Sequence, residues 1–266
     1  MNFEKIITEI KSVREFTKQK VDFNLVNKIL IDLDNLEKIN DLPMEYVTIE
    51  DGKQFAKDYD GKIGYYGKLI EAPSYILVFG EDSDEARINA GYNLEWVRFS
   101  LFDAGVGSCW ISPMAGVNYT ELFDRKDGSV LLGCIAIGEE YTGIFKKNTD
   151  EQSQRKGVAE FVYKDSWKNE ITWEELESLG LDGVFYLTKM APSWGNCQPW
   201  AFVIENGLLK LYINKAGQND YTLEAGIISL YFMKAAESKG LRIKVSLYEG
   251  PKEIKDSYEC LVIFSM

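Results

Sequence analysis

Two long apolar segments dominate the pattern of hydrophobic and polar positions along the chain. They span residues 90–105 and 225–240, and each opens with an Ala-Gly pair and ends on a glycine. Both are apolar on nearly every face and carry only a few charges, which is typical of a helix that is buried all round. The sequence therefore predicts two long helices, each running through the centre of its own half of the chain.

Shorter apolar stretches accompany the two segments in the same order. The matched stretches are 42–52 with 198–207, 75–79 with 208–213, and 134–137 with 260–263. Several matches in one order favour an internal duplication. The alternative is two unrelated α+β halves with ordinary apolar periodicity.

Each half reads as helix, strand, strand, long helix, strand. This order predicts an α+β fold with helices packed on a mostly antiparallel sheet. A polar, charged stretch at 146–156 (KKNTDEQSQRK) divides the chain near its middle. We therefore expect two half-units, 1–150 and 151–266, packed as an intramolecular pseudo-dimer with the long helices at its centre.

The charge of the chain limits its partners. It has 30 basic and 42 acidic residues, a net charge of −12 and a pI near 4.7. Such a surface repels nucleic acid and anionic membranes, so a bound anion needs a local basic cluster. The N-terminus lacks the apolar core of a signal peptide, and no charge-free span of about 18 apolar residues is present. We expect a cytoplasmic protein with no membrane or nucleic-acid partner.

Histidine is absent from the sequence, and the four cysteines form no CxxC pair. These two facts argue against a metal site and against Ser-His-Asp or Cys-His nucleophile systems. The cysteines are interpreted as buried thiols. If the protein is an enzyme, a cofactor supplies its difficult chemistry.

Two motifs carry candidate chemistry. In KSVREF (residues 11–16), two cations flank a hydroxyl on or at the end of the first predicted helix. This arrangement can hold a phosphate, although a Lys and an Arg three apart on a helix usually just form its solvent-exposed face. In APSWGNCQPW (residues 191–200), two prolines and a glycine predict a shaped loop. The hydrogen-bonding side chains and two indoles of this loop suit a heteroaromatic ring. The alternative is a turn in which Ser193 and Asn196 only cap their own backbone.

The second motif resembles the APSxxNxQPW signature of the FMN-dependent nitroreductase family. KSVREF resembles the family's RSxRxF motif, DAGVGSCWIS (103–112) is similar to its GLGSCW segment, and QRKG (154–157) is similar to its late basic element. The resemblance is closest to single-chain members with two tandem halves. It implies one FMN site with a phosphate end, a ring end and a backbone contact near the flavin N5.

Carried over by motif, the resemblance implies nine cofactor-binding positions. The phosphate end falls on Lys11, Ser12, Arg14, Arg155 and Lys156, the ring end on Pro192, Ser193 and Asn196, and the N5 contact on the backbone near Ser112. Two departures stand out: Lys11 replaces the usual arginine, and Pro113 has no N–H to offer. No catalytic side chain is expected, because the flavin carries out the chemistry.

The resemblance implies an FMN-dependent oxidoreductase that takes hydride from NAD(P)H and reduces a small flat acceptor by a ping-pong mechanism. Nitroaromatics, quinones and enones remain open as acceptors, as does the choice between NADH and NADPH. The alternatives are a flavin-binding carrier or sensor without turnover, and a scaffold that has lost its flavin. The first half keeps KSVREF and GVGSCW, whereas only the second keeps PSWGN. We therefore expect one flavin per chain, built from both halves, in a chain that can act as a monomer.

Overall fold

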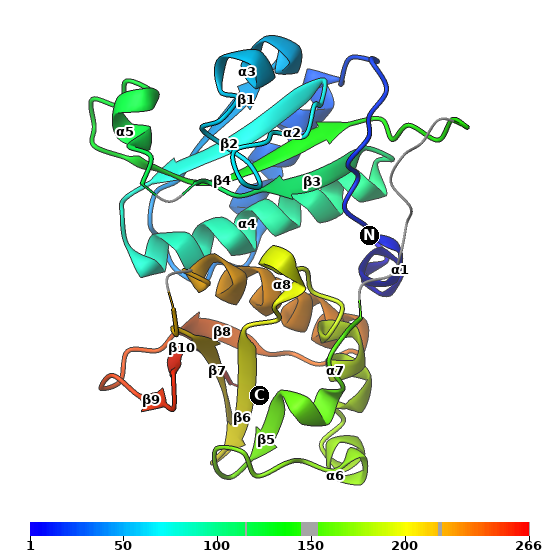
Figure 1. Ribbon diagram of the computed structural model, residues 1–266. Coiled ribbons are helices and arrows are strands. Elements are labelled where there is room, and N and C mark those ends of the chain that lie inside the picture. The colour runs from blue at the N-terminus through cyan, green and yellow to red at the C-terminus, as the bar shows by residue number, and fades with distance from the viewer. Residues whose placement is uncertain (115, 145–153, 218–219, 266) are drawn as a thin grey trace. The chain divides into compact units, whose positions relative to one another are not determined.

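A computed structural model describes residues 1–114, 116–144, 154–217 and 220–265 (Figure 1). The chain forms two compact units, which are described separately below. The first comprises Met1, Ile10–Leu36 and Leu42–Gln152, and the second Asn2–Glu9, Glu37–Asp41 and Ser153–Met266. The predicted boundary between 150 and 151, and most of the predicted linker at 146–156, lie outside the described residues, so this division stays a prediction.

The first unit is an α+β layer structure. Its elements are α2 (Phe23–Asp32), the 3-10 helix η1 (Leu33–Asn35), β1 (Glu45–Ile49), α3 (Gly52–Asp58), β2 (Ser74–Gly80), α4 (Asp84–Asp103), β3 (Gly107–Ile111), α5 (Tyr119–Leu122) and β4 (Val130–Gly138). The strands form an antiparallel sheet in the order β1-β2-β4-β3. Helix α4 lies along one face of this sheet (Figure 1).

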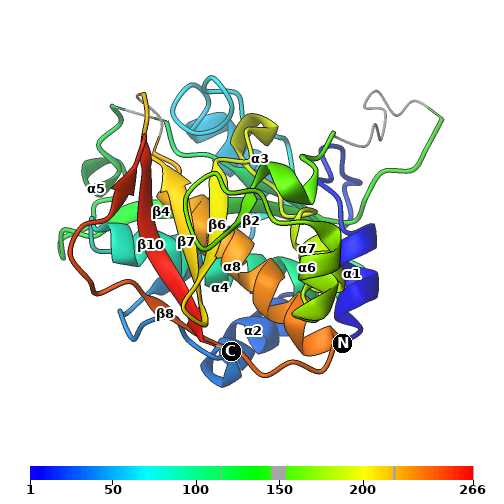
Figure 2. The ribbon, with the colours of Figure 1, turned by 90° about the horizontal axis from the view of Figure 1, so that it is seen from below.

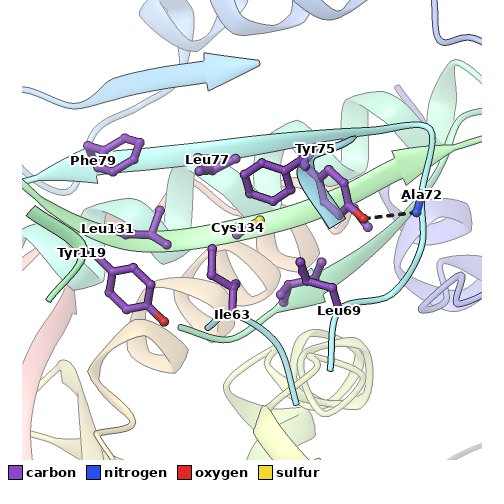
Figure 3. Close-up of a cluster of buried hydrophobic side chains, with 12 residues drawn as sticks. Ile63, Leu69, Ala72, Tyr75, Leu77, Phe79, Tyr119, Leu131 and Cys134 are labelled. Carbon is purple, nitrogen blue, oxygen red and sulfur yellow. Dashed lines mark hydrogen bonds between the residues drawn. The ribbon is translucent and has the colours of Figure 1, made fainter. Parts of the chain in front are cut away.

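Both faces of the central strands in this sheet are buried. Every residue of β2 is buried, which explains its unbroken apolar run. Figure 3 shows Tyr75, Leu77 and Phe79 on the face opposite α4, pointing toward the loop that carries Ile63 and Leu69. The buried Tyr75 hydroxyl donates to the Ile70 carbonyl (2.7 Å), which anchors that loop to the sheet.

The second unit has a larger sheet. Its elements are α1 (Phe3–Glu9), the 3-10 helix η2 (Val158–Glu160), β5 (Val162–Lys164), α6 (Trp173–Ser178), α7 (Asp182–Thr188), the 3-10 helix η3 (Trp194–Asn196), β6 (Trp200–Glu205), β7 (Leu208–Asn214), α8 (Thr222–Ser238), β8 (Lys244–Leu247), β9 (Ile254–Lys255) and β10 (Tyr258–Ser265). The sheet order is β5-β6-β7-β10-β8, and β9 pairs with β10. Figure 2 shows α1 and α7 alongside α8, and the three helices are in contact.

Phenylalanine rings join α8 to the sheet of the second unit. Phe202 of β6 lies 5.8 Å from Phe232 of α8, and Phe232 lies 4.7 Å from Phe264 of β10, measured between ring centroids. All three side chains are fully buried. Aromatic pairs at these distances add stabilisation beyond the area they bury, and they fix α8 on this face.

The two long helices end in the same way. Gly105 follows α4 with φ of 78°, and Gly240 follows α8 with φ of 77°. In both, the residue after the glycine donates its N–H five residues back, from Val106 to Leu101 and from Leu241 to Ala236. A glycine in the left-handed region closes each helix without a steric penalty from a Cβ atom.

Both units also share one strand order. When β5 and β9, which have no counterpart in the first unit, are set aside, two antiparallel strands precede the long helix and two follow it. The sheet order by chain position is then first, second, fourth, third in each unit (β1-β2-β4-β3 and β6-β7-β10-β8). The predicted α+β class, the antiparallel sheets and the long helices are confirmed. This common order is what an internal duplication predicts.

Two parts of the prediction were wrong. Each half was expected to have one strand after its long helix, but β3 and β8 come first and lie at the edges of their sheets. Edge strands have a weak apolar pattern, because water or a loop covers one side of them. The KSVREF motif was placed on or at the end of the first helix, but α1 ends at Glu9 and the motif is extended backbone.

A buried ion pair lies inside the first unit. Arg98 donates from Nη1 to Glu95 Oε1 at 2.8 Å, and both side chains are at most 1% exposed. The indole N–H of Trp110 in β3 donates to Glu95 (2.5 Å), and Arg98 Nε donates to the Ser108 hydroxyl (3.2 Å). The pair thus joins α4 to β3 through satisfied hydrogen bonds, as a buried pair requires.

We expect Arg98→Met to lower the free energy of unfolding by about 3–5 kcal/mol, because it leaves the Glu95 carboxylate buried without a counter-charge. The double variant Glu95→Gln/Arg98→Met should recover much of this loss, since the amide oxygen still accepts the Trp110 N–H. Urea unfolding of the three proteins measures both effects. A double variant no more stable than Arg98→Met would contradict this account.

Candidate functional site

The KSVREF segment runs alongside the sheet of the first unit. Val13 donates its N–H to the Ser108 carbonyl (2.9 Å), and Ser12 and Ser108 form a parallel bridge. Further along, Phe16 bridges Glu140 beyond the end of β4. The segment therefore extends the sheet past its β3 edge, and this pairing holds the backbone of the three predicted phosphate residues Lys11, Ser12 and Arg14.

Two glycines allow this close approach. A Cβ atom on Gly107 would lie 2.9 Å from the side chain of Val13, and one on Gly138 would lie 3.0 Å from Phe16 and 2.5 Å from Pro73. Real Cβ atoms do not come that close, so any side chain at either position would force the backbone to move. The second glycine of GVGSCW thus makes room for KSVREF.

The side chains of KSVREF differ in their availability to an anion. Lys11 forms an ion pair with Glu140 (2.8 Å), a residue that the sequence gave no reason to select. The Ser12 hydroxyl is hydrogen-bonded to the Cys109 thiol, whose pKa is raised by burial. Arg14 is exposed and forms no ion pair with any residue in the described part of the chain. A hollow of about 130 Å³, lined in part by Lys11, Ser108 and Glu140, adjoins the segment.

Ser112 lies directly after β3, at the opposite end of that strand from Ser108. Its carbonyl accepts the N–H of Gly64 (3.0 Å), and Ile63 bridges Pro113. The backbone near the predicted N5 contact is therefore held by the glycine-rich loop before β2. Pro113, the residue after Ser112, has no backbone N–H, so it offers no donor at this point.

The PSWGNCQ loop connects α7 to β6 in the second unit, and the predicted basic pair contacts it directly. Arg155 Nη1 donates to Asn196 Oδ1 (2.7 Å). The Lys156 N–H donates to Gln198 Oε1 (2.8 Å), and Lys156 Nζ donates to the Gln198 carbonyl (2.8 Å). The structure thus brings Arg155 and Lys156 together with Asn196, and it adds Gln198 to the site.

Pro192 and Ser193 form the first turn of the same loop. The Ser193 hydroxyl accepts the N–H of Gln198 (2.8 Å), which closes the loop on itself. The sequence left open that Ser193 merely binds the backbone of its own loop. This hydrogen bond is a contact of that kind.

Arg155 and Lys156 are partly buried and have neutral partners. Burial lowers the pKa of both side chains. Within the described ranges, neither forms an ion pair with a carboxylate. The charge of Glu160 acts on Lys156 in the opposite direction, but burial is the larger effect. A partly desolvated cation is costly, and a bound anion would lower that cost. In a chain with a net charge of −12, this is the arrangement expected of an anion site.

A buried carboxyl group lies under the same loop. Glu224, in the first turn of α8, is 5% exposed, and its Oε1 accepts the Trp194 N–H (3.0 Å). Burial raises the pKa of this carboxyl group to about 7, the hydrogen bond from Trp194 lowers it, and the charge of Asp220 raises it. The sequence analysis missed Glu224, because nothing near it in the sequence marks it as a contact of the loop.

The described helices include none whose length and apolar composition would allow it to cross a membrane. Each unit is an α+β layer with one long buried helix on a mostly antiparallel sheet, in which β5 and β6 of the second unit form a parallel pair. A family model described as "Putative TM nitroreductase" matches residues 2–236. The chain belongs to this nitroreductase family, which places it among the nitroreductase-family oxidoreductases.

One solved structure shows the same fold, and two others are similar over part of the chain. A protein from Thermotoga maritima described as a "putative nitroreductase" is 20% identical, with a TM-score of 0.60, and the match covers 98% of this chain and 93% of that one. A nitroreductase family protein from Streptococcus pneumoniae is 18% identical (TM-score 0.49), over 59% of this chain and 97% of its own. A nitroreductase-like protein from Bacillus cereus is 19% identical (TM-score 0.48), over 60% and 94%. No curated protein sequence matches the chain significantly.

We expect Glu224→Gln to remove a pH dependence of stability. The folded-state pKa of Glu224 is raised from 4.5 to about 7, so its contribution to stability is complete below about pH 4.5 and is lost as the pH rises toward 7. At about pH 8 the glutamine variant should be more stable than the parent by roughly 2–3 kcal/mol, and at about pH 4 the gap should close. Urea unfolding of both proteins across this range tests the prediction. An equal pH dependence in both would contradict it.

Proposed function

We propose that the chain is an FMN-dependent oxidoreductase that takes hydride from NAD(P)H and reduces a small flat acceptor of the nitroaromatic, quinone or enone type by a ping-pong mechanism. The main supporting observation is a pair of partly buried cations, Arg155 and Lys156, that contact the PSWGNCQ loop and donate to neutral oxygens of Asn196 and Gln198. Together with membership of the nitroreductase family, this anion site supports a phosphorylated flavin.

The first unit supports the same cofactor by its geometry. Ser12 is paired with Ser108 at one end of β3, and Ser112 follows the other end. Four residues of extended strand span roughly 13 Å. Predicted phosphate and ring contacts at opposite ends of one strand suit an elongated ligand, and Gly107 keeps the backbone open at the phosphate end.

When bound, the isoalloxazine ring supplies the redox chemistry, since it can accept a hydride and pass electrons on. The side chains of the chain have other tasks. Arg155, Lys156 and Arg14 attract the phosphate and balance its charge. Ser112 and the loop that holds it present backbone to the ring, and Pro192 offers an apolar surface. Since the chain has no histidine, a mechanism that needs no imidazole base agrees with its composition.

The stoichiometry is one FMN per chain. Each cofactor motif occurs once in the sequence, because the stretch 35–43 lacks PSxxN and the segment 240–245 lacks GVGSCW. A chain that carries one complete set does not need a second copy of itself to bind FMN.

The purified protein should contain about one FMN per chain, identified by chromatography of the released cofactor. Under anaerobic conditions NADH or NADPH should bleach the flavin, and steady-state rates with a quinone or a nitroaromatic should give parallel lines in double-reciprocal plots. Intersecting lines would contradict the ping-pong mechanism. Bound FMN that neither nucleotide reduces would favour the flavin-binding carrier or sensor, and protein that stays colourless with added FMN would end both proposals.

A further inference from the structure

The two amide side chains of the PSWGNCQ loop are hydrogen-bonded within the loop and to residues 154–156. Asn196 accepts from Arg155 through Oδ1 and donates from Nδ2 to the Gln154 carbonyl (2.8 Å). Gln198 accepts the Lys156 N–H through Oε1 and donates from Nε2 to the carbonyls of Gln154 and Asn196 (3.3 Å each). Both amide oxygens and both N–H groups of Gln198 are thus engaged, and Asn196 is tied on one side to Arg155 and on the other to Gln154, with one of its two N–H groups left over.

The backbone of the loop is strained in order to make these contacts. Gly195, Asn196 and Gln198 have φ values of 55°, 56° and 49°. Asparagine and glycine tolerate this left-handed region, but glutamine rarely occupies it. Such strain persists only where the surrounding hydrogen bonds hold the residue in place. Here the Ser193 hydroxyl holds the Gln198 N–H, and Lys156 Nζ holds the Gln198 carbonyl.

The two cations are therefore pre-oriented by neutral groups. Among the described residues, the Arg155 guanidinium and the Lys156 ammonium each give one hydrogen bond to the loop, which leaves most of their N–H donors available. Carboxylate partners would have held the same side chains but would have cancelled their charge. Amides hold them and leave the charge available to an anion.

We propose that Asn196 and Gln198 are positioning residues that hold Arg155 and Lys156 as a preformed site for the phosphate of the cofactor, so that Asn196 contributes to cofactor binding at the phosphate and not at the ring. This inference rests on the proposed FMN function, and it moves Asn196 from the ring end, where the family resemblance put it, to the phosphate end. Burial of both cations, which lowers the pKa of each, supports it, because a dianionic phosphate offsets that cost.

Comparison of FMN with riboflavin separates the two roles, since riboflavin has the same ring without the phosphate. We expect Asn196→Ala to weaken FMN binding by roughly tenfold to a hundredfold, the usual range for loss of a hydrogen bond to a charged group, and to change riboflavin binding by less than about twofold. In the Arg155→Met background, Asn196→Ala should add little to the loss of FMN affinity, because the two residues act together. Equal losses for FMN and riboflavin would overturn the proposal.

Asn169→Ala is a matched control. The Asn169 amide also donates to a backbone carbonyl in the second unit, that of Lys164 (2.8 Å), but it does not contact the basic pair. This variant should bind both flavins like the parent. Asn196→Asp keeps an oxygen acceptor for Arg155 but adds a carboxylate, and it should lose FMN at least as strongly as the alanine variant while it still binds riboflavin.

A second measurement does not depend on the flavin. Inorganic phosphate should raise the thermal midpoint of the apoprotein, because a ligand that binds only the folded state stabilises it, and Asn196→Ala should reduce that rise. If the protein bound no FMN but kept this phosphate effect, the proposed function would fail and the anion site would stand. A phosphate effect equal in parent and variant would overturn the positioning role.

Discussion

The cost of taking a cation out of water governs the candidate site. The second unit meets this cost in two ways. Lys210 donates to Glu205 and Glu253 at 3.0 Å each; burial lowers the pKa of Lys210, but the two carboxylates raise it overall. The Arg155 guanidinium donates instead to the side-chain oxygen of Asn196, and the Lys156 ammonium donates to the backbone carbonyl of Gln198. The two carboxylates neutralise the charge of Lys210, so that arrangement is structural. The neutral oxygens leave the positive potential of Arg155 and Lys156 in place, and binding an anion requires that potential.

In the first unit the equivalent constraint is steric. KSVREF can join the sheet only because Gly107 and Gly138 lack side chains, and its neighbour Ser108 is braced by the buried Arg98. Arg98 in turn depends on Glu95, whose other oxygen accepts from Trp110. A buried ion pair adds little net stability, but it specifies one arrangement of α4 against β3. The segment that carries Ser12 and Arg14 therefore docks on a strand whose position is well defined.

The apolar pattern predicted the elements that bury large surfaces. The two long helices, with their terminal Gly105 and Gly240, could be located because a helix that is apolar all round and ends on a glycine has few other interpretations. The edge strands β3 and β8 were missed, because half of an edge strand lies outside the core and leaves a weak pattern. The periodicity of apolar residues therefore predicts an element well only when that element is buried on most sides.

Motifs predicted which polar residues belong to the site, but not what each one contacts. Asn196 and Arg155 were both selected, yet their hydrogen bond crosses 41 positions of sequence. Glu140 and Glu224 were not selected, because a carboxylate that pairs across the fold has no local signal. The assignment of Asn196 to the ring followed the family pattern, and only the occupied amide suggests otherwise.

The common strand order and the unequal motifs have one physical explanation. The helix ends correspond residue by residue, from Val106 with Leu241 onward, so the counterpart of Gly107 is Arg242. A Cβ atom at Gly107 would already clash with Val13, and an arginine at the corresponding position leaves no room for a segment docked in the same way. The apolar positions that build the fold can therefore persist in both units, while the close approach that KSVREF needs exists in the first. This restriction, local to a single residue, explains why only the first unit carries a docked KSVREF segment, and it agrees with the single flavin per chain proposed above.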